Sequence, residues 1–108
     1  MQQEYSLEIL YAAQIEIEEI GEVYLELVGP NSARDITNRI YDALENLCEF
    51  PLMGTLLDDR VLRELGYRKL ICGVYLCFYR VMGNIVYVHH VVDGRTEYKR
   101  LFGSMISE

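Results

Sequence analysis

The side chains best suited to chemistry in this sequence are basic and aromatic residues of its C-terminal half. They are Arg68, Lys69, Arg80, Arg95, Tyr98, Lys99 and Arg100. An arginine guanidinium matches the oxygens of a phosphate group, and a tyrosine can stack on a nucleobase or exchange a proton. The structural alternative is that tyrosines fill strands while arginines solubilise the edges of a sheet. On the functional interpretation, these residues predict contact with a phosphate-containing partner.

The distribution of charge allows such a partner, although the whole chain is acidic, with a net charge of −7. Residues 1–59 carry 13 acidic and 2 basic side chains, whereas residues 60–108 carry 4 acidic and 8 basic ones. A phosphate backbone responds to the charge within a Debye length of about 8 Å, not to the average over the molecule. The C-terminal half can therefore present a locally basic surface. The alternative interpretation is a solvated acidic face with scattered surface arginines, and the acidic glutamates of residues 12–28 are expected to be mostly solvated.

Other familiar reaction centres are not predicted. His89 and His90 are adjacent, and adjacent residues of a regular strand point to opposite faces, so we expect them to share no metal ion. The cysteines Cys48, Cys72 and Cys77 include no C-x-x-C pair, which suits a reducing cytoplasm and inert buried thiols. The eight glycines form no phosphate-binding loop. We expect neither a metal nor a cofactor.

The elements that position these residues begin with a strand and two helices. Residues 1–10 alternate apolar and polar side chains, which predicts a strand. From residue 12 to 28, apolar residues recur at helical spacing among glutamates. A Gly-Pro-Asn sequence at 29–31 ends this helix, and a second one is expected to start near Ser32 and to end before Pro51. Because the break is short, the two helices are predicted to form an antiparallel hairpin.

The C-terminal half predicts three strands, over residues 67–72, 74–82 and 85–92, with a Gly-Asn turn between the last two. Residues 50–66 are expected to form a loop with at most one helical turn, and residues 95–102 a short helix or a tail. The 108 residues thus predict a single α+β domain, residues 1–108. It has an N-terminal strand, the helical hairpin and a three-stranded antiparallel C-terminal sheet. No segment resembles an export signal or a membrane span.

The order of these elements and several short strings resemble the RelE/ParE family, the toxins of type II toxin–antitoxin (plasmid stabilisation) systems. The similarity extends over residues 5–102, and its strength lies in the order and spacing of the strings. The strings are Ala12-Ala13, Phe50-Pro51-x-x-Gly54, Gly66-Tyr67-Arg68-Lys69-Leu70, Phe78-Tyr79-Arg80-Val81 and Val92-x-Gly94-Arg95-x-x-Tyr98. The resemblance implies the β-α-α-β-β-β arrangement predicted above.

The family has two branches, and the resemblance implies a different activity for each. RelE-like members are ribosome-dependent endoribonucleases that cut mRNA without a metal ion. ParE-like members inhibit DNA gyrase and have no catalytic residues of their own. The first hypothesis for this chain is an mRNA endoribonuclease that inhibits growth. The alternatives are a gyrase inhibitor and a degenerate toxin that only binds its antitoxin.

On the nuclease hypothesis, the matching positions imply roles for individual residues. Tyr98 resembles the tyrosine that takes the proton of a ribose 2′-hydroxyl, and cations stabilise the phosphorane that follows. The implied catalytic residues are Arg68, Lys69, Arg95 and Tyr98, and the implied substrate-binding residues are Arg80, Lys99 and Arg100. Two departures favour the alternatives: Leu76 stands where RelE-like nucleases have an arginine, and Asp93 stands where many relatives have His, Tyr or Lys.

The resemblance also implies partners. A cognate antitoxin protein is expected to neutralise the chain, forming a toxin–antitoxin hetero-oligomer, and a homodimer is a further possibility. The expected targets are the ribosome and its mRNA, or DNA gyrase on the alternative hypothesis. No cofactor, metal or membrane is expected to take part, and the expected location is the cytoplasm.

Overall fold

The structure of this protein is a computed structural model that describes residues 4–103. Its elements follow one another along the chain as β1 (Ser6–Ile9), α1 (Tyr11–Leu27), α2 (Pro30–Asn46), β2 (Thr55–Leu56), α3 (Arg60–Glu64), β3 (Arg68–Cys72), β4 (Tyr75–Met82), β5 (Ile85–Asp93) and α4 (Lys99–Phe102). The strand predicted within residues 1–10 is β1. Residues 1–3 of that predicted segment lie outside the described part. The segment predicted as a short helix or a tail contains α4.

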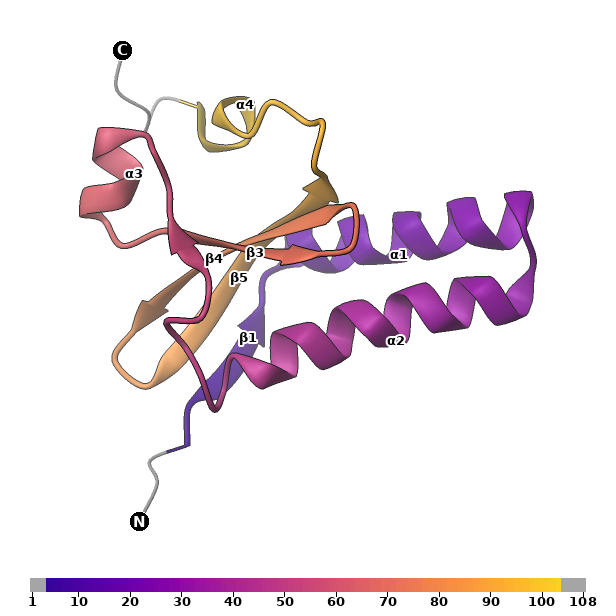
Figure 1. The fold of residues 1–108 in the computed structure, drawn as a ribbon, viewed down its shortest axis with the longest axis horizontal. Coiled ribbons are helices and arrows are strands. Elements are labelled where there is room, and N and C mark those ends of the chain that lie inside the picture. Colours follow the sequence, from indigo (N-terminus) through magenta and orange to yellow (C-terminus); the bar gives the residue numbers. More distant parts are fainter. Residues whose placement is uncertain (1–3, 104–108) are drawn as a thin grey trace.

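The helices α1 and α2 form the predicted antiparallel hairpin, which lies along one side of the sheet (Figure 1). The second helix, expected to start near Ser32, begins two residues earlier, at Pro30. Proline has a φ fixed at about −65° and lacks the backbone N–H, which would have no partner in a first helical turn. Gly29, with φ of 138°, makes the preceding turn possible. No helix within residues 4–103 has both the length and the apolar composition needed to cross a membrane.

The strands form a single mixed sheet in the order β1-β5-β4-β3-β2. β1 runs parallel to β5, and the other neighbours are antiparallel. The α+β class, the N-terminal strand and the antiparallel arrangement of β3, β4 and β5 are confirmed. The sheet has one strand more than expected, because the segment predicted as a loop contributes β2 and also α3.

Apolar residues are buried on both faces of the sheet. The larger core lies between the sheet and the helical hairpin, where Ala13, Ile17 and Ile40 are fully buried. A second, smaller core has Leu57 and Leu62 from the segment around α3, Phe78 from β4 and Phe102 from α4. The short elements α3 and α4 therefore cover the face of the sheet that the hairpin leaves open (Figure 1).

A bulge in β5 changes the expected positions of the two histidines. Phe78 pairs with His90 and Tyr79 pairs with Val88, which leaves His89 without an opposite residue in β4. An extra residue in one strand disrupts the alternation of side chains, so adjacent residues no longer have to face opposite sides. The prediction that His89 and His90 point to opposite faces is therefore wrong, and both rings contact the second core.

Candidate functional site

The two histidines belong to a group of rings on the α3–α4 side of the sheet, which we call the aromatic–histidine cluster: Tyr67, Phe78, His89, His90 and Phe102. Phe102 packs edge-on against Tyr67, with ring centroids 5.0 Å apart, and against His90, at 5.6 Å. His89 packs edge-on against Tyr67 at 5.0 Å. Edge-to-face contacts of this kind stabilise by about 0.5–1.5 kcal/mol beyond the burial of apolar area. They fix the orientation of both imidazoles.

Arg80 is the basic residue that contacts this cluster directly. Its guanidinium carbon lies 5.0 Å from the centroid of the Tyr67 ring, a cation–π contact. Its Nη2 atom lies 2.9 Å from the sulfur of Met82. The candidate substrate-binding residue Arg80 thus lies over an aromatic ring of the second core.

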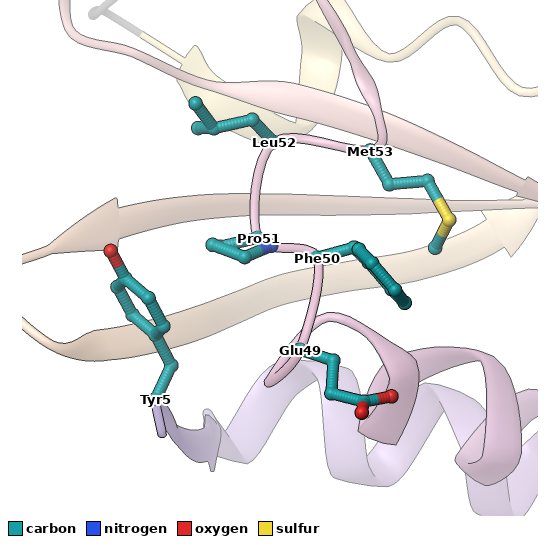
Figure 2. Close-up of a pocket in the computed structure, with 6 residues that line it drawn as sticks. All are labelled: Tyr5, Glu49, Phe50, Pro51, Leu52 and Met53. Atoms are coloured by element: carbon teal, nitrogen blue, oxygen red, sulfur yellow. The ribbon is translucent and has the colours of Figure 1, made fainter. Parts of the chain in front are cut away.

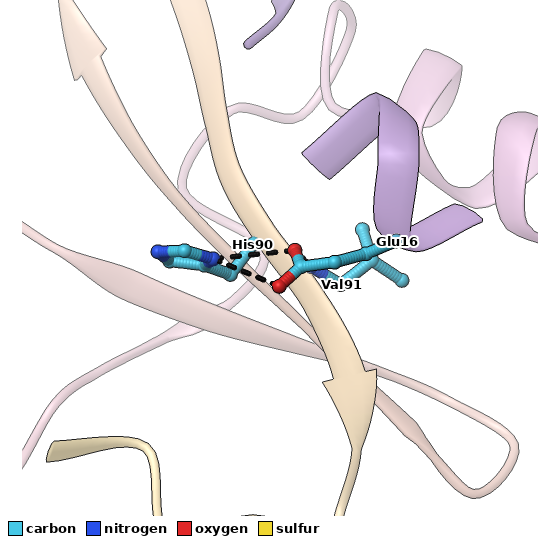
Figure 3. Close-up of polar contacts among 3 residues, drawn as sticks. All are labelled: Glu16, His90 and Val91. Carbon is cyan, nitrogen blue, oxygen red and sulfur yellow. Dashed lines mark hydrogen bonds and ion pairs between the residues drawn. The ribbon is translucent and has the colours of Figure 1, made fainter. Parts of the chain in front are cut away.

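Glu16 of α1 reaches the same region from the other side of β5 (Figure 3). Its carboxylate accepts a hydrogen bond from the backbone N–H of Val91 at 3.0 Å and lies 3.1 Å from Nδ1 of His90. The pairing of β1 with β5 ends at Val88, so Glu16 satisfies a backbone donor of β5 beyond the last residue of β1. The interpretation of α1 as a solvated acidic scaffold therefore does not hold for Glu16. Sequence reasoning missed this role, because the periodicity of a helix does not reveal which strand edge it meets.

The electrostatics of the cluster keep His89 neutral at pH 7. Burial, followed by the nearby positive charges of His90 and Arg80, lowers the pKa of His89 to about 4. A neutral imidazole can donate or accept a hydrogen bond, but it brings no positive charge to a phosphate. Residues 4–103 contain no group of three or more His, Cys, Asp or Glu side chains arranged to hold a metal ion.

Two of the four candidate catalytic residues are engaged in structural contacts. The guanidinium of Arg68 donates to the backbone carbonyl of Gly54 at 2.7 Å and lies 3.4 Å from that of Leu52. The ring of Tyr98 stacks on Phe78 with centroids 5.4 Å apart. The Tyr98 hydroxyl is buried and has no hydrogen-bond partner.

The other candidate residues lie at the surface. Arg95 is ion-paired with Asp93 at 3.1 Å, and its side chain is 93% exposed. The hydrogen bonds from Arg95 lower the pKa of Asp93, so this carboxylate stays ionised beside the arginine. Arg100 pairs with Glu97 at 3.5 Å, and Lys99 is exposed. Lys69 is half-buried in β3. In the described part of the chain, no hydrogen bond, ion pair or ring contact joins any two of Arg68, Lys69, Arg95 and Tyr98.

The buried hydroxyl of Tyr98 makes the first testable prediction. A buried polar atom without a partner costs about 1–3 kcal/mol, so Tyr98→Phe is expected to raise the free energy of unfolding by about 1 kcal/mol. The matched control is Tyr79→Phe, since the Tyr79 hydroxyl makes two hydrogen bonds. This control is expected to lose about 1–3 kcal/mol. Urea denaturation followed by circular dichroism measures both, and equal destabilisation of the two variants would contradict the buried position of Tyr98.

Comparison with known proteins places this geometry in a family. The family model described as "ParE toxin of type II toxin-antitoxin system, parDE" matches residues 7–98. The chain belongs to the ParE toxin family. The predicted RelE/ParE membership is thereby confirmed. A search of curated proteins finds no match to this chain.

Solved structures show the same fold in other ParE and RelE systems. One is the chromosomal ParDE system of P. aeruginosa, with a TM-score of 0.70, 21% identity and coverage of 82% of this chain and 95% of that one. The toxin–antitoxin complex RelBE2 of Mycobacterium tuberculosis has a TM-score of 0.63 and 19% identity, covering 84% of this chain and 99% of that one. A mutant of the E. coli toxin RelE in its free state has a TM-score of 0.62 and 16% identity, with 95% of each chain covered. This ParE family member thus shares its fold with both branches.

Proposed function

We propose that this ParE family member is a toxin that inhibits DNA gyrase by binding, without a chemical step, and that a cognate antitoxin protein neutralises it. The observation that carries the proposal is the environment of Tyr98. A general base must lie within hydrogen-bonding reach of the proton that it removes. The Tyr98 hydroxyl is buried, and its ring is stacked on Phe78 within the second core. This position supports a packing role for the residue that the nuclease hypothesis makes the base.

The cationic residues support the same choice. Stabilising a phosphorane requires preorganised positive charges aimed at one group. Arg68 is bonded to loop carbonyls, and Arg95 is paired with Asp93, which carries a charge that repels phosphate. Leu76, at the position where RelE-like nucleases have an arginine, packs against the second core. These features favour an inhibitor that binds its target over an enzyme that cuts RNA.

The experiment that tests the proposal is induction of the toxin without antitoxin, with two separate readouts. We expect the induced toxin to inhibit DNA supercoiling by gyrase and to leave ribosome-bound mRNA intact. Cleaved transcripts with unaffected supercoiling would overturn the proposal and select the nuclease hypothesis. Normal growth with neither effect would also overturn it and select the degenerate toxin.

A Tyr98→Phe variant gives a sharper form of this test. It removes only the hydroxyl, so the ring still stacks on Phe78, and we expect growth inhibition to match that of the parent. A residue acting as general base contributes about 10²–10⁴-fold to a rate, so a nuclease should lose most of its activity. Tyr87→Phe, a second half-buried tyrosine, controls for nonspecific effects. Growth curves after induction at matched protein levels measure the difference.

The proposed antitoxin is tested by thermal unfolding. A ligand that binds only the native state stabilises it by RT ln(1 + [L]/Kd). We expect the melting temperature of the toxin to rise with antitoxin concentration and the two proteins to elute together. An unchanged melting temperature together with separate elution would refute the partnership.

A further inference from the structure

The loop of residues 50–54, which we call the pinned loop, contains the Phe-Pro-x-x-Gly string that the proposed function does not use. Tyr79, fully buried in β4, donates its hydroxyl proton to the carbonyl of Pro51 at 2.8 Å and accepts from the N–H of Gly54 at 2.9 Å. Arg68 adds the bond to the carbonyl of Gly54. Polar groups of the loop backbone are therefore tied to the sheet from the inside.

The same arrangement leaves apolar side chains of the pinned loop in solvent. Phe50 is 59% exposed, Leu52 is 64% exposed and Met53 is 48% exposed. Together with Tyr5, Glu49 and Pro51 they line a shallow, open cavity of about 600 Å³ (Figure 2). Exposed apolar groups that gather around one opening mark a binding surface, and a loop already held in place loses little conformational entropy on binding.

The charge around this cavity identifies the chemistry of its occupant. Glu49 is the only ionised side chain among the six residues that line it. Two further acidic residues lie beside this lining. The backbone N–H of Cys48, which precedes Glu49, donates to the carbonyl of Glu45 at 3.0 Å, and the N–H of Tyr5, which follows Glu4, donates to the carbonyl of Cys48 at 3.3 Å. An acidic rim of Glu4, Glu45 and Glu49 repels the phosphates of RNA and DNA. It also opposes a second copy of this chain, which would bring the same carboxylates against each other.

We propose that the pinned loop is the docking site for a segment of the antitoxin that inserts an apolar side chain into the cavity and places lysine or arginine beside the acidic rim. This inference rests on the proposed neutralisation by an antitoxin. A partner protein of this chemistry satisfies both the apolar lining and the negative rim, whereas a target complexed with nucleic acid brings phosphate charge to a negative surface. Six lining residues are fewer than the roughly 20–30 residues that each side of a standard interface supplies, so the site anchors one segment of a larger contact.

The test compares antitoxin binding by the parent and by the double variant Leu52→Ser, Met53→Ser, using isothermal titration calorimetry. We expect the Kd of the double variant to rise by about 10–100-fold, because central apolar anchors contribute most of an interface's energy. The matched control is Ile71→Ser, Val74→Ser, which replaces two other exposed apolar residues, 70% exposed in β3 and 63% exposed in the turn that follows it. The control is expected to keep the parental Kd.

A charge reversal provides a second variant in case the first one alters folding. Glu49 is exposed, and Glu49→Lys is expected to raise the Kd by about 3–10-fold at low salt, with the difference shrinking as salt screens the rim. Parental Kd values for both test variants, or equal losses in the double variant and its control, would overturn the docking site while leaving the antitoxin partnership intact. A parent chain that fails to bind the antitoxin would overturn both the docking site and the proposed neutralisation.

Discussion

Replacing Gly54 by alanine is expected to lower the free energy of unfolding by about 3–5 kcal/mol, through overpacking and broken hydrogen bonds. A Cβ atom at this position would lie 2.6 Å from the carbonyl oxygen of Lys69 and 2.8 Å from the hydroxyl of Tyr79. A backbone carbonyl within a sheet cannot move aside without disturbing the pairing of its strand. The Tyr79 hydroxyl cannot move without losing its bonds to Pro51 and Gly54. Small domains are stable by only about 5–15 kcal/mol, so this single methyl group removes a large part of the total.

The measurement is urea denaturation of the Gly54→Ala variant beside a matched glycine variant. Gly73 has a φ of 61°, and a Cβ atom added there would meet no other atom within 4 Å. Asparagine tolerates this backbone conformation. Gly73→Asn is therefore expected to cost less than about 1 kcal/mol. Similar transition midpoints for the two variants would show that the close approach of Gly54 to the sheet does not constrain the loop.

Lowering the pH from 7.5 to 4 is expected to lower the free energy of unfolding by about 2 kcal/mol through His89 alone. This figure is smaller than the full pKa shift implies, because the His89 side chain is partly exposed to solvent. Burial and the charges of His90 and Arg80 lower the pKa of His89 from 6.5 to about 4 in the folded chain. Between these two values the unfolded chain binds a proton that the folded chain does not. The contribution of neutral His89 to the stability of the folded chain is therefore complete above pH 6.5 and declines as the pH falls toward 4.

The contribution of His89 is separated from that of the carboxylates by a variant. His89→Phe keeps a ring against Tyr67 and removes the titrating group, so its stability should depend less on pH between 6.5 and 4 than that of the parent. The free energy of unfolding of both proteins, measured by urea denaturation at several pH values, gives the difference. Parallel pH curves for the parent and His89→Phe would mean that His89 is not a buried neutral imidazole.

Much of the fold is determined by patterns within short stretches of the sequence. The hairpin of α1 and α2 follows from apolar spacing interrupted by glycine and proline, because helices satisfy their backbone locally. β4 and β5 follow from apolar runs on either side of Gly83, which adopts a φ of 63° in the turn. A family whose strings occur in the same order is also visible in the sequence, and the match over residues 7–98 confirms it.

Tertiary structure alone decided which distant residues lie in contact. The bulge that brings His89 and His90 to one cluster depends on the register of β4 against β5, which no local pattern specifies. The pairing of β1 with β5, and the contact of Glu16 with Val91, join residues that are far apart in the sequence. Arginine and tyrosine are equally suited to binding phosphate and to satisfying buried backbone groups or filling a core. The type of residue therefore predicted chemistry at Arg68 and Tyr98. Long-range packing instead bonds the Arg68 side chain to a loop carbonyl and stacks Tyr98 on Phe78 in the second core.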